Sequence, residues 1–175
     1  IRDDNPVIVI ENRILFYEEE EVPEGEWIVP LGSADVARRG TDVTVVACGY
    51  ARRKALAAAK RLEGEIDVEV VDPRTIVPLD METLLSSVRR TGRLIVVHEA
   101  SGLCGIAAEI AALAATKAFD ALRAPVVRLT GPDAPSASSW ALEQAAVPQA
   151  DAVVTTTHAL LARDESIIKT NLHIA

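Results

Sequence analysis

The sequence predicts an α/β fold in which a mostly parallel sheet carries helices on both faces, giving three layers. Continuous runs rich in β-branched residues at 43–48 (VTVVAC) and 94–98 (LIVVH) are typical of strands buried on both faces. Helical periodicity follows each run, and strands that alternate with helices form right-handed βαβ units. With 175 residues, 49% of them hydrophobic, the chain is long enough for one such domain.

The first βα pair shows the pattern on which the prediction rests. The strand at 43–48 is followed by a helix at 52–63, on which Leu56, Ala59 and Leu62 form one apolar stripe. In chain order, the later elements are expected as strand 68–71, helix 81–90 with Asp80 as its N-cap, strand 94–98, helix 106–119, strand 126–129 and helices 140–146 and 151–163.

Acidic residues are concentrated near the N-terminus. Residues 1–40 contain ten acids and four arginines, whereas the other 135 residues contain 16 acids and 14 bases. Four contiguous glutamates at 18–21 cannot all face one ion, so we interpret them as part of a solvated connector rather than as a metal site. Proline and glycine interrupt the same region, and the connector is expected to extend over residues 18–39.

The composition argues against several classes of protein. With 26 acidic and 18 basic residues, a net charge of −8, the chain lacks the basic face of a nucleic-acid-binding protein. No uncharged apolar run reaches 18 residues, so no membrane span is expected. Two cysteines, Cys48 and Cys104, do not make a disulfide framework and indicate a reducing compartment.

Few groups with catalytic chemistry fall at the carboxyl ends of the predicted strands, where ligands bind in such sheets. Gly102 and Gly105 could cradle a phosphate, but the full dinucleotide fingerprint is absent and a tight turn is the preferred interpretation. His98 and Glu99 are adjacent in a strand and therefore point to opposite faces. We expect a hydrogen-bonded histidine at the strand end rather than an acid–base pair.

Two further candidates also favour structural roles. Cys48 lies in an apolar strand and is expected to be an inert core thiol. Asp72 and Arg74 are expected to form an ion pair that fixes the loop after the second strand. The sequence therefore predicts no catalytic and no cofactor-binding residue in this chain.

Seven motifs, in a fixed order and spacing, cover nearly the whole chain to about residue 163. They are IRDDNPVIVIEN (1–12), VPLGSA (29–34), GTDVTVV (40–46), VVDPRTIVPLD (70–80), GRLIVVHEA (92–100), AEIA (108–111) and VRLTGPDAP (127–135). As a set they resemble the β subunits of thiamine-diphosphate-dependent 2-oxo acid dehydrogenases of the pyruvate, branched-chain and acetoin type. Departures at Pro73, Ala107 and Ala137 affect local geometry only.

The resemblance implies a division of the chain. Residues 1–17 would be the residual end of a pyrimidine-binding domain, 18–39 an acidic connector, 40–163 a transketolase-type C-terminal domain and 164–175 a tail. In such a subunit the preceding half supplies the glutamate that activates the cofactor, and the α subunit supplies the diphosphate and magnesium site. We therefore expect thiamine diphosphate and magnesium only in the parent heterotetramer, with this chain alone inactive.

The resemblance also implies a role in assembly, in a bacterial cytoplasm or a mitochondrial matrix. The expected partners are the α subunit, a second β subunit and the peripheral-subunit-binding module of the acyltransferase core. Ile1, Asp3 and Asn5 match a potassium site of the family, although an Asx-type turn at Asp3 or Asn5 is the alternative. Two other functions stay open: another transketolase-superfamily enzyme, or a free-standing flavodoxin-like ligand-binding module.

Overall fold

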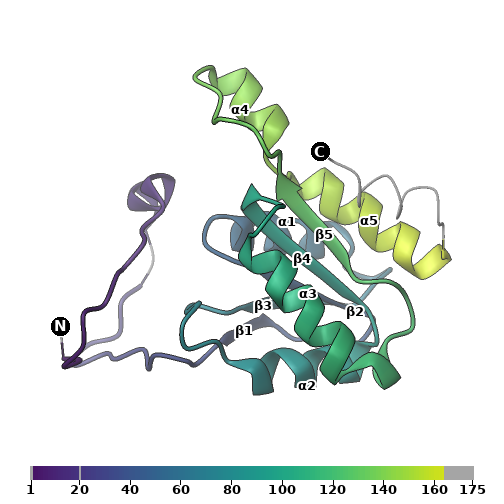
Figure 1. Ribbon diagram of the computed structural model, residues 1–175, viewed down its shortest axis with the longest axis horizontal. Coiled ribbons are helices and arrows are strands. Elements are labelled where there is room, and N and C mark those ends of the chain that lie inside the picture. Colours follow the sequence, from purple (N-terminus) through teal and green to yellow (C-terminus); the bar gives the residue numbers. More distant parts are fainter. Residues whose placement is uncertain (1, 20, 164–175) are drawn as a thin grey trace.

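The computed structural model describes residues 2–19 and 21–163 (Figure 1). Its centre is a five-stranded sheet with the spatial order β1-β3-β2-β4-β5. The strands are β1 (Asp35–Arg38), β2 (Val43–Ala47), β3 (Val68–Asp72), β4 (Leu94–Ser101) and β5 (Val127–Gly131). Strands β2 to β5 pair in parallel, whereas β1 pairs antiparallel with β3 at one edge.

Helices cover both faces of this sheet, which confirms the predicted three-layer α/β architecture. Helices α1 and α5 pack on one face, and α2 and α3 pack on the other (Figure 1). Short α4 stands away from the sheet at its carboxyl end. The helical elements are α1 (Ala51–Arg61), α2 (Met81–Thr91), α3 (Ile106–Lys117), α4 (Trp140–Ala146) and α5 (Ala150–Ala162), with 3-10 turns η1 (Arg13–Tyr17) and η2 (Phe119–Ala121).

The core divides into two apolar layers because side chains alternate between the faces of each strand. On β2, Val43 and Val45 point toward α1 and α5, whereas Val46 points toward α2 and α3. Both layers consist mainly of alanine, valine, leucine and isoleucine, as the low aromatic content requires. Among the described residues, no helix combines the length and the apolar character that a membrane crossing needs.

One part of the expected connector belongs to the sheet. The connector was expected to reach residue 39, but Asp35–Arg38 form β1 along the edge of β3. Hydrogen bonds fix the approach to this strand, since Gly32 N donates to Thr75 Oγ1 (2.9 Å) and Ala34 N donates to Asp80 Oδ2 (2.9 Å). The expectation of an exposed connector is therefore wrong for these four residues. The expected tail, residues 164–175, lies outside the described residues.

Asp80 is the N-cap that the sequence predicts for α2. Its Oδ1 accepts a hydrogen bond from Thr83 N (3.1 Å), and its Oδ2 accepts one from Thr83 Oγ1 (2.8 Å) in addition to the bond from Ala34 N. Burial acts to raise the pKa of Asp80, but the hydrogen bonds outweigh it and hold the pKa below its ordinary value. A single carboxylate thus joins the start of α2 to the approach to β1.

Replacing Asp80 with alanine should lower the free energy of unfolding by about 1 kcal/mol at pH 7, because the N-terminal amides of α2 lose their acceptor. A carboxylate with a lowered pKa in the folded chain stabilises above its unfolded pKa, and the contribution is lost as the pH falls through the folded pKa. The difference between Asp80→Ala and the parent chain should therefore shrink in acid. Urea denaturation at several pH values measures it, and Asp80→Asn, which keeps an acceptor oxygen, is the control. A difference that stays constant down to low pH would contradict this assignment.

Candidate functional site

The carboxyl end of the sheet is where the fold places a candidate site. Strand β2 lies between β3 and β4, so the chain turns to opposite sides after β2 and β4, and ligands bind at such switch points. At this end of β4, Glu99 Oε1 lies 3.1 Å from Lys54 Nζ of α1. Asn12 Nδ2 donates to Glu99 Oε2 (3.3 Å), and the Lys54 ammonium lies 5.0 Å from the ring centroid of Tyr50.

In this cluster, protein groups pair with one another. Lys54 is 8% exposed, and burying its charge is tolerable because Glu99 neutralises it and the Tyr50 ring faces it. Asn12 also accepts a hydrogen bond from Ile14 N through Oδ1 (3.0 Å), so the same side chain caps η1 and ties it to β4. Lys54 was not among the residues that the sequence singled out, although its place on the alanine-rich, buried face of α1 is a signal that could have identified a buried cation.

His98 does not have the hydrogen bonds that the sequence led us to expect. The residue is half-buried, and within the described part of the chain its Nδ1 has no hydrogen-bond partner. Burial lowers the pKa of His98, and the neighbouring Glu99 charge opposes this only in part. The expectation of a satisfied histidine is therefore wrong for Nδ1. The imidazole is held neutral at physiological pH, beside but not paired with the Lys54–Glu99 contact.

The loop after β3 is fixed by two carboxylates and two arginines, not by a direct Asp72–Arg74 ion pair. Arg52 of α1 lies 3.2 Å from Asp35 and 3.6 Å from Asp72, and Arg74 lies 3.6 Å from Asp35. The contact between Asp72 and Arg74 is a backbone hydrogen bond, from Arg74 N to Asp72 Oδ1 (2.9 Å). The predicted role in fixing the loop is confirmed, but the predicted partner is wrong because the edge strand β1 supplies Asp35.

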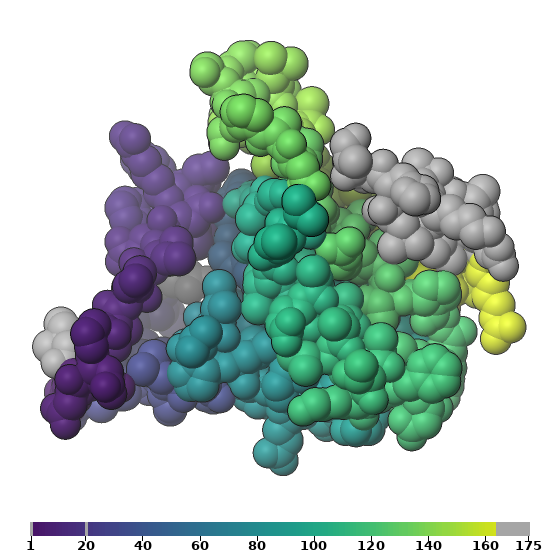
Figure 2. Space-filling view, viewed as in Figure 1, coloured from purple at the N-terminus to yellow at the C-terminus, as the bar shows by residue number. Residues whose placement is uncertain are grey.

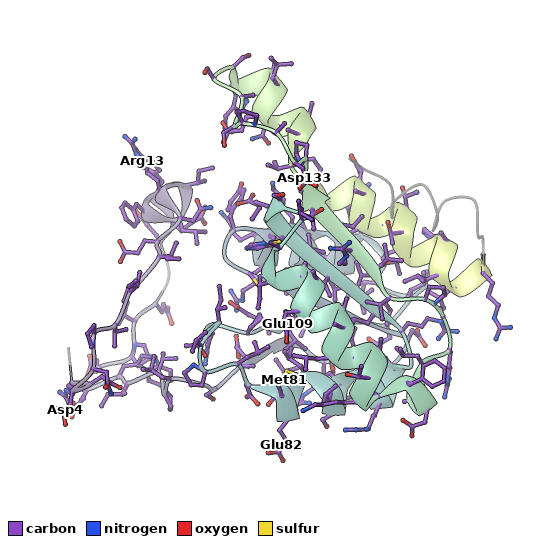
Figure 3. The ribbon with its side chains drawn as sticks, viewed as in Figure 1. Asp4, Arg13, Met81, Glu82, Glu109 and Asp133 are labelled. Carbon is purple, nitrogen blue, oxygen red and sulfur yellow. The ribbon has the colours of Figure 1, made fainter. Side chains whose placement is uncertain are left out.

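The turn between β4 and α3 is shaped by close packing. A Cβ on Gly105 would lie 2.4 Å from the Ser101 carbonyl oxygen, and one on Gly102 would lie 2.8 Å from Thr130 Oγ1. Asp133 closes the turn from the loop after β5, where it accepts from the Ser101 hydroxyl and from Leu103 N (Figure 3). These hydrogen bonds lower the pKa of the Asp133 carboxyl. The tight-turn interpretation is confirmed for Gly105, whose close neighbour is backbone of the same turn, whereas the close neighbour of Gly102 is a side chain of β5.

The remaining candidates also lack the features of a reactive centre. Burial, with a smaller contribution from Asp72, raises the pKa of the Cys48 thiol to about 12, so at neutral pH it is an inert thiol as expected. Near the N-terminus, Asn5 N and Asn5 Nδ2 donate to Asp3 Oδ1 at 2.8 and 3.0 Å, which is the Asx-type turn. Ile1 lies outside the described residues. Among those described, no three histidine, cysteine or acidic side chains gather to hold a metal ion.

The sheet order and the covering helices define an α/β domain whose polar groups at the strand ends pair with one another and hold the structure together. Residues 32–153 match the family model described as "Transketolase, C-terminal domain". The chain belongs to this family. The match begins just before β1 and ends within α5, so it covers the whole sheet and leaves outside it residues 1–31, which we call the N-terminal arm.

The chain is also similar to larger curated proteins. It is 43% identical over 162 residues to the acetoin:2,6-dichlorophenolindophenol oxidoreductase subunit beta of Bacillus subtilis, covering 92% of this chain and 47% of that protein. It is 41% identical over 162 residues to the pyruvate dehydrogenase E1 component subunit beta of Rhizobium meliloti, covering 91% and 35%. The chain thus spans about half the length, or less, of these relatives.

A solved structure agrees with the sequence comparisons. The structure titled "Split gene transketolase, inactive beta4 tetramer" superposes with a TM-score of 0.70 at 32% identity, over 82% of this chain and 46% of that one. Here too the likeness covers about half of the larger chain. It supports the same α/β architecture that the strand order and helix layers establish.

Proposed function

We propose that this chain is the C-terminal domain of the β subunit of a 2-oxo acid dehydrogenase. The parent reaction would be the thiamine-diphosphate-dependent oxidative decarboxylation of pyruvate or a related 2-oxo acid, with acyl transfer to lipoyl groups. The observation that carries the proposal is the 43% identity to an acetoin oxidoreductase β subunit, which extends beyond the family domain into the N-terminal arm and covers 92% of the chain.

Within that enzyme, this domain would serve assembly instead of catalysis. The described groups at the strand ends do not fit a diphosphate: Lys54 and Glu99 neutralise each other, and the Asp133 carboxylate already accepts from the Ser101 hydroxyl and from Leu103 N at the Gly102–Gly105 turn. The partners would be the α subunit, a second β subunit and the basic peripheral-subunit-binding module of the acyltransferase core. An acidic chain of net charge −8 attracts such a module over a distance.

The purified chain should not reduce a dye with pyruvate or acetoin when thiamine diphosphate and magnesium are supplied, because it holds no group that fits the cofactor. It should nevertheless bind a peripheral-subunit-binding module at low ionic strength, with affinity that falls as salt is added. Dye-reduction assays and calorimetric titration measure the two properties. Turnover by the chain alone would contradict the assembly role, as would a strict monomer that does not bind the module.

A transketolase subunit is the second candidate, favoured by the structural likeness to a split-gene transketolase at 32% identity. The higher identity to the oxidoreductase and dehydrogenase β subunits supports the first candidate. Co-purification separates them, because only the first requires an α subunit of the dehydrogenase type. For the parent enzyme we propose the location that the resemblance implies, a bacterial cytoplasm or a mitochondrial matrix.

A potassium site at Ile1, Asp3 and Asn5 is part of the proposal for the longer subunit. Oxygen ligands suit a hard cation, and the second oxygen of Asp3 is not used in the turn with Asn5. In a full-length subunit, Asp3→Ala should remove the rise in melting temperature that potassium gives over sodium at equal ionic strength. Asp4→Ala, at the neighbouring exposed carboxylate, is the control. A potassium effect that survives in Asp3→Ala would rule out the site.

A further inference from the structure

Helix α1 begins with three consecutive cations. Arg52, Arg53 and Lys54 lie in its first turn, which contains no acidic residue. Positive side chains are unfavourable at this position, because the N-terminal end of a helix is the positive end of its dipole. Each cation is paired with a carboxylate from another part of the chain. Arg52 contacts carboxylates of β1 and β3, and Lys54 contacts Glu99 of β4.

The carboxylate that pairs with Arg53 comes from outside the sheet. Glu18, in the N-terminal arm, forms an ion pair with the Arg53 guanidinium. Over residues 2–19 and 21–163, Arg53 has no other salt-bridge partner. The family match begins at residue 32, so this contact joins the domain to the segment that precedes it.

A second contact joins the same arm to the next cation of α1. Asn12 Nδ2 donates to Glu99 Oε2 (3.3 Å), and Oε1 of the same carboxylate lies 3.1 Å from Lys54 Nζ. Asn12 is the N-cap of η1 and Glu18 is its C-cap, so both ends of this short turn are fastened near the start of α1. Two contact points fix the direction of η1, whereas a single contact would leave it free to pivot.

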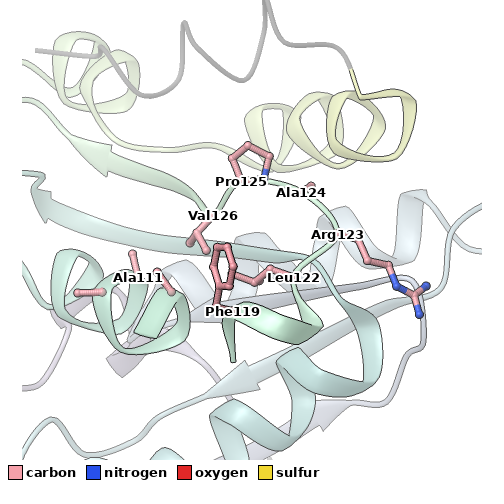
Figure 4. Close-up of a pocket in the computed structure, with 9 residues that line it drawn as sticks. Ala111, Phe119, Leu122, Arg123, Ala124, Pro125 and Val126 are labelled. Atoms are coloured by element: carbon pink, nitrogen blue, oxygen red, sulfur yellow. The ribbon is translucent and has the colours of Figure 1, made fainter. Parts of the chain in front are cut away.

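Burial of apolar side chains does not hold η1 in place. The arm follows a hairpin-like path beside the sheet, with η1 at its tip (Figures 1 and 2). No residue of η1 is buried, and Phe16 is 66% exposed and Tyr17 82%. An apolar hollow of about 600 Å³ lies at the opposite end of the sheet, where Pro125 and Val126 precede β5 (Figure 4). The polar contacts of the two cap residues are therefore what fastens η1.

We infer that Asn12 and Glu18 form a two-point clasp by which the N-terminal arm docks on the first turn of α1. In this arrangement Glu18, the first of four contiguous glutamates, is a docking residue and not part of a solvated connector. The clasp sets the direction in which the chain enters the domain. Because its contacts lie within one chain, the clasp does not depend on the proposed function.

Chymotryptic cleavage of the 175-residue chain after Phe16 measures how much of the arm is released, because the protease acts on the open form. Arg53→Glu should speed this cleavage about tenfold, since attraction to Glu18 becomes repulsion, and Asn12→Ala about threefold, since one contact remains. Arg61→Glu is the matched control. It makes the same charge change on the same helix, but Arg61 pairs with Asp151 of α5, so the rate should not change. Circular dichroism verifies that each variant is folded.

Exchanging the two charges gives the sharper test. Combining Arg53→Glu with Glu18→Arg restores an opposite pair and should return the cleavage rate toward that of the parent chain. Peptides of residues 8–24, with and without Glu18→Arg, correct for the sequence preference of the protease. An unchanged rate in Arg53→Glu, an equal acceleration in Arg61→Glu, or a double variant as fast as Arg53→Glu alone would each overturn the inference. None of these results bears on assembly, so the proposed function is tested separately.

Discussion

Replacing Arg90 with methionine should lower the free energy of unfolding by about 3 kcal/mol, because it leaves a buried carboxylate without its cation. Glu69, the second residue of β3, is 0% exposed, and the Arg90 guanidinium contacts both of its carboxylate oxygens. The Arg90 side chain is partly exposed. Water can therefore enter the space that the guanidinium leaves, which keeps the loss of stability near the low end of the range for buried pairs. Urea denaturation followed by far-UV circular dichroism measures the change.

A double variant distinguishes the effect of losing the whole ion pair from the effect of leaving one buried charge unpaired. Combining Arg90→Met with Glu69→Leu removes both charges, so the double variant should be more stable than Arg90→Met alone. Arg90→Lys keeps the charge but not the two-oxygen contact and should fall between the parent chain and Arg90→Met. A loss below about 0.5 kcal/mol in Arg90→Met, the range of an ordinary surface substitution, would show that the pair does not stabilise the sheet.

Gly40→Ala should be about as destabilising, at roughly 3 kcal/mol, because the added methyl group has no space and its neighbours cannot move. A Cβ on Gly40 would lie 2.4 Å from Glu69 N and from the Val68 carbonyl carbon, both in the backbone of β3. Moving β3 away would break its pairing with β2, in which Val43 lies opposite Val68. The same denaturation measurement gives the loss.

Gly64→Ala is the matched control for a glycine that is constrained by conformation alone. Gly64 has φ +85° and no atom within 4 Å of an added Cβ, so its substitution should cost about 1 kcal/mol of backbone strain. The two variants together distinguish a lack of space from a lack of conformational freedom. Equal losses in both would contradict the packing interpretation of Gly40.

Most strands of the sheet and the helices that cover it were predictable because the sequence signals for them are local. The β-branched run at 43–48 identifies β2 without any knowledge of its neighbours, and Asp80 marks the start of α2 one residue before Met81. Strand β1 was missed because its four residues, DVAR, are too few to show a strand pattern, and they follow a stretch rich in glutamate, proline and glycine. Its assignment as a strand comes from antiparallel pairing with β3, a contact between distant parts of the chain.

The polar contacts were less predictable, since they join elements that are far apart in the sequence. Lys54 and Glu99 are separated by 45 positions, and Asn12 and Glu99 by 87. Asp72 and Arg74 looked like natural partners because they are close in the chain, but Asp35 and Arg52 compete for them once β1 and α1 are in place. Residue types predicted which groups would be charged, and only the fold decided their partners.

Both tryptophans of the chain lie outside the hydrophobic core, Trp27 on the N-terminal arm and Trp140 on α4, each about two-thirds exposed. An indole that is already in water emits at long wavelength, and it continues to do so when the sheet unfolds. Intrinsic fluorescence is consequently almost blind to the cooperative loss of this domain. The same property makes it a selective optical reporter, since a blue shift can arise only when one of these two protruding segments becomes covered.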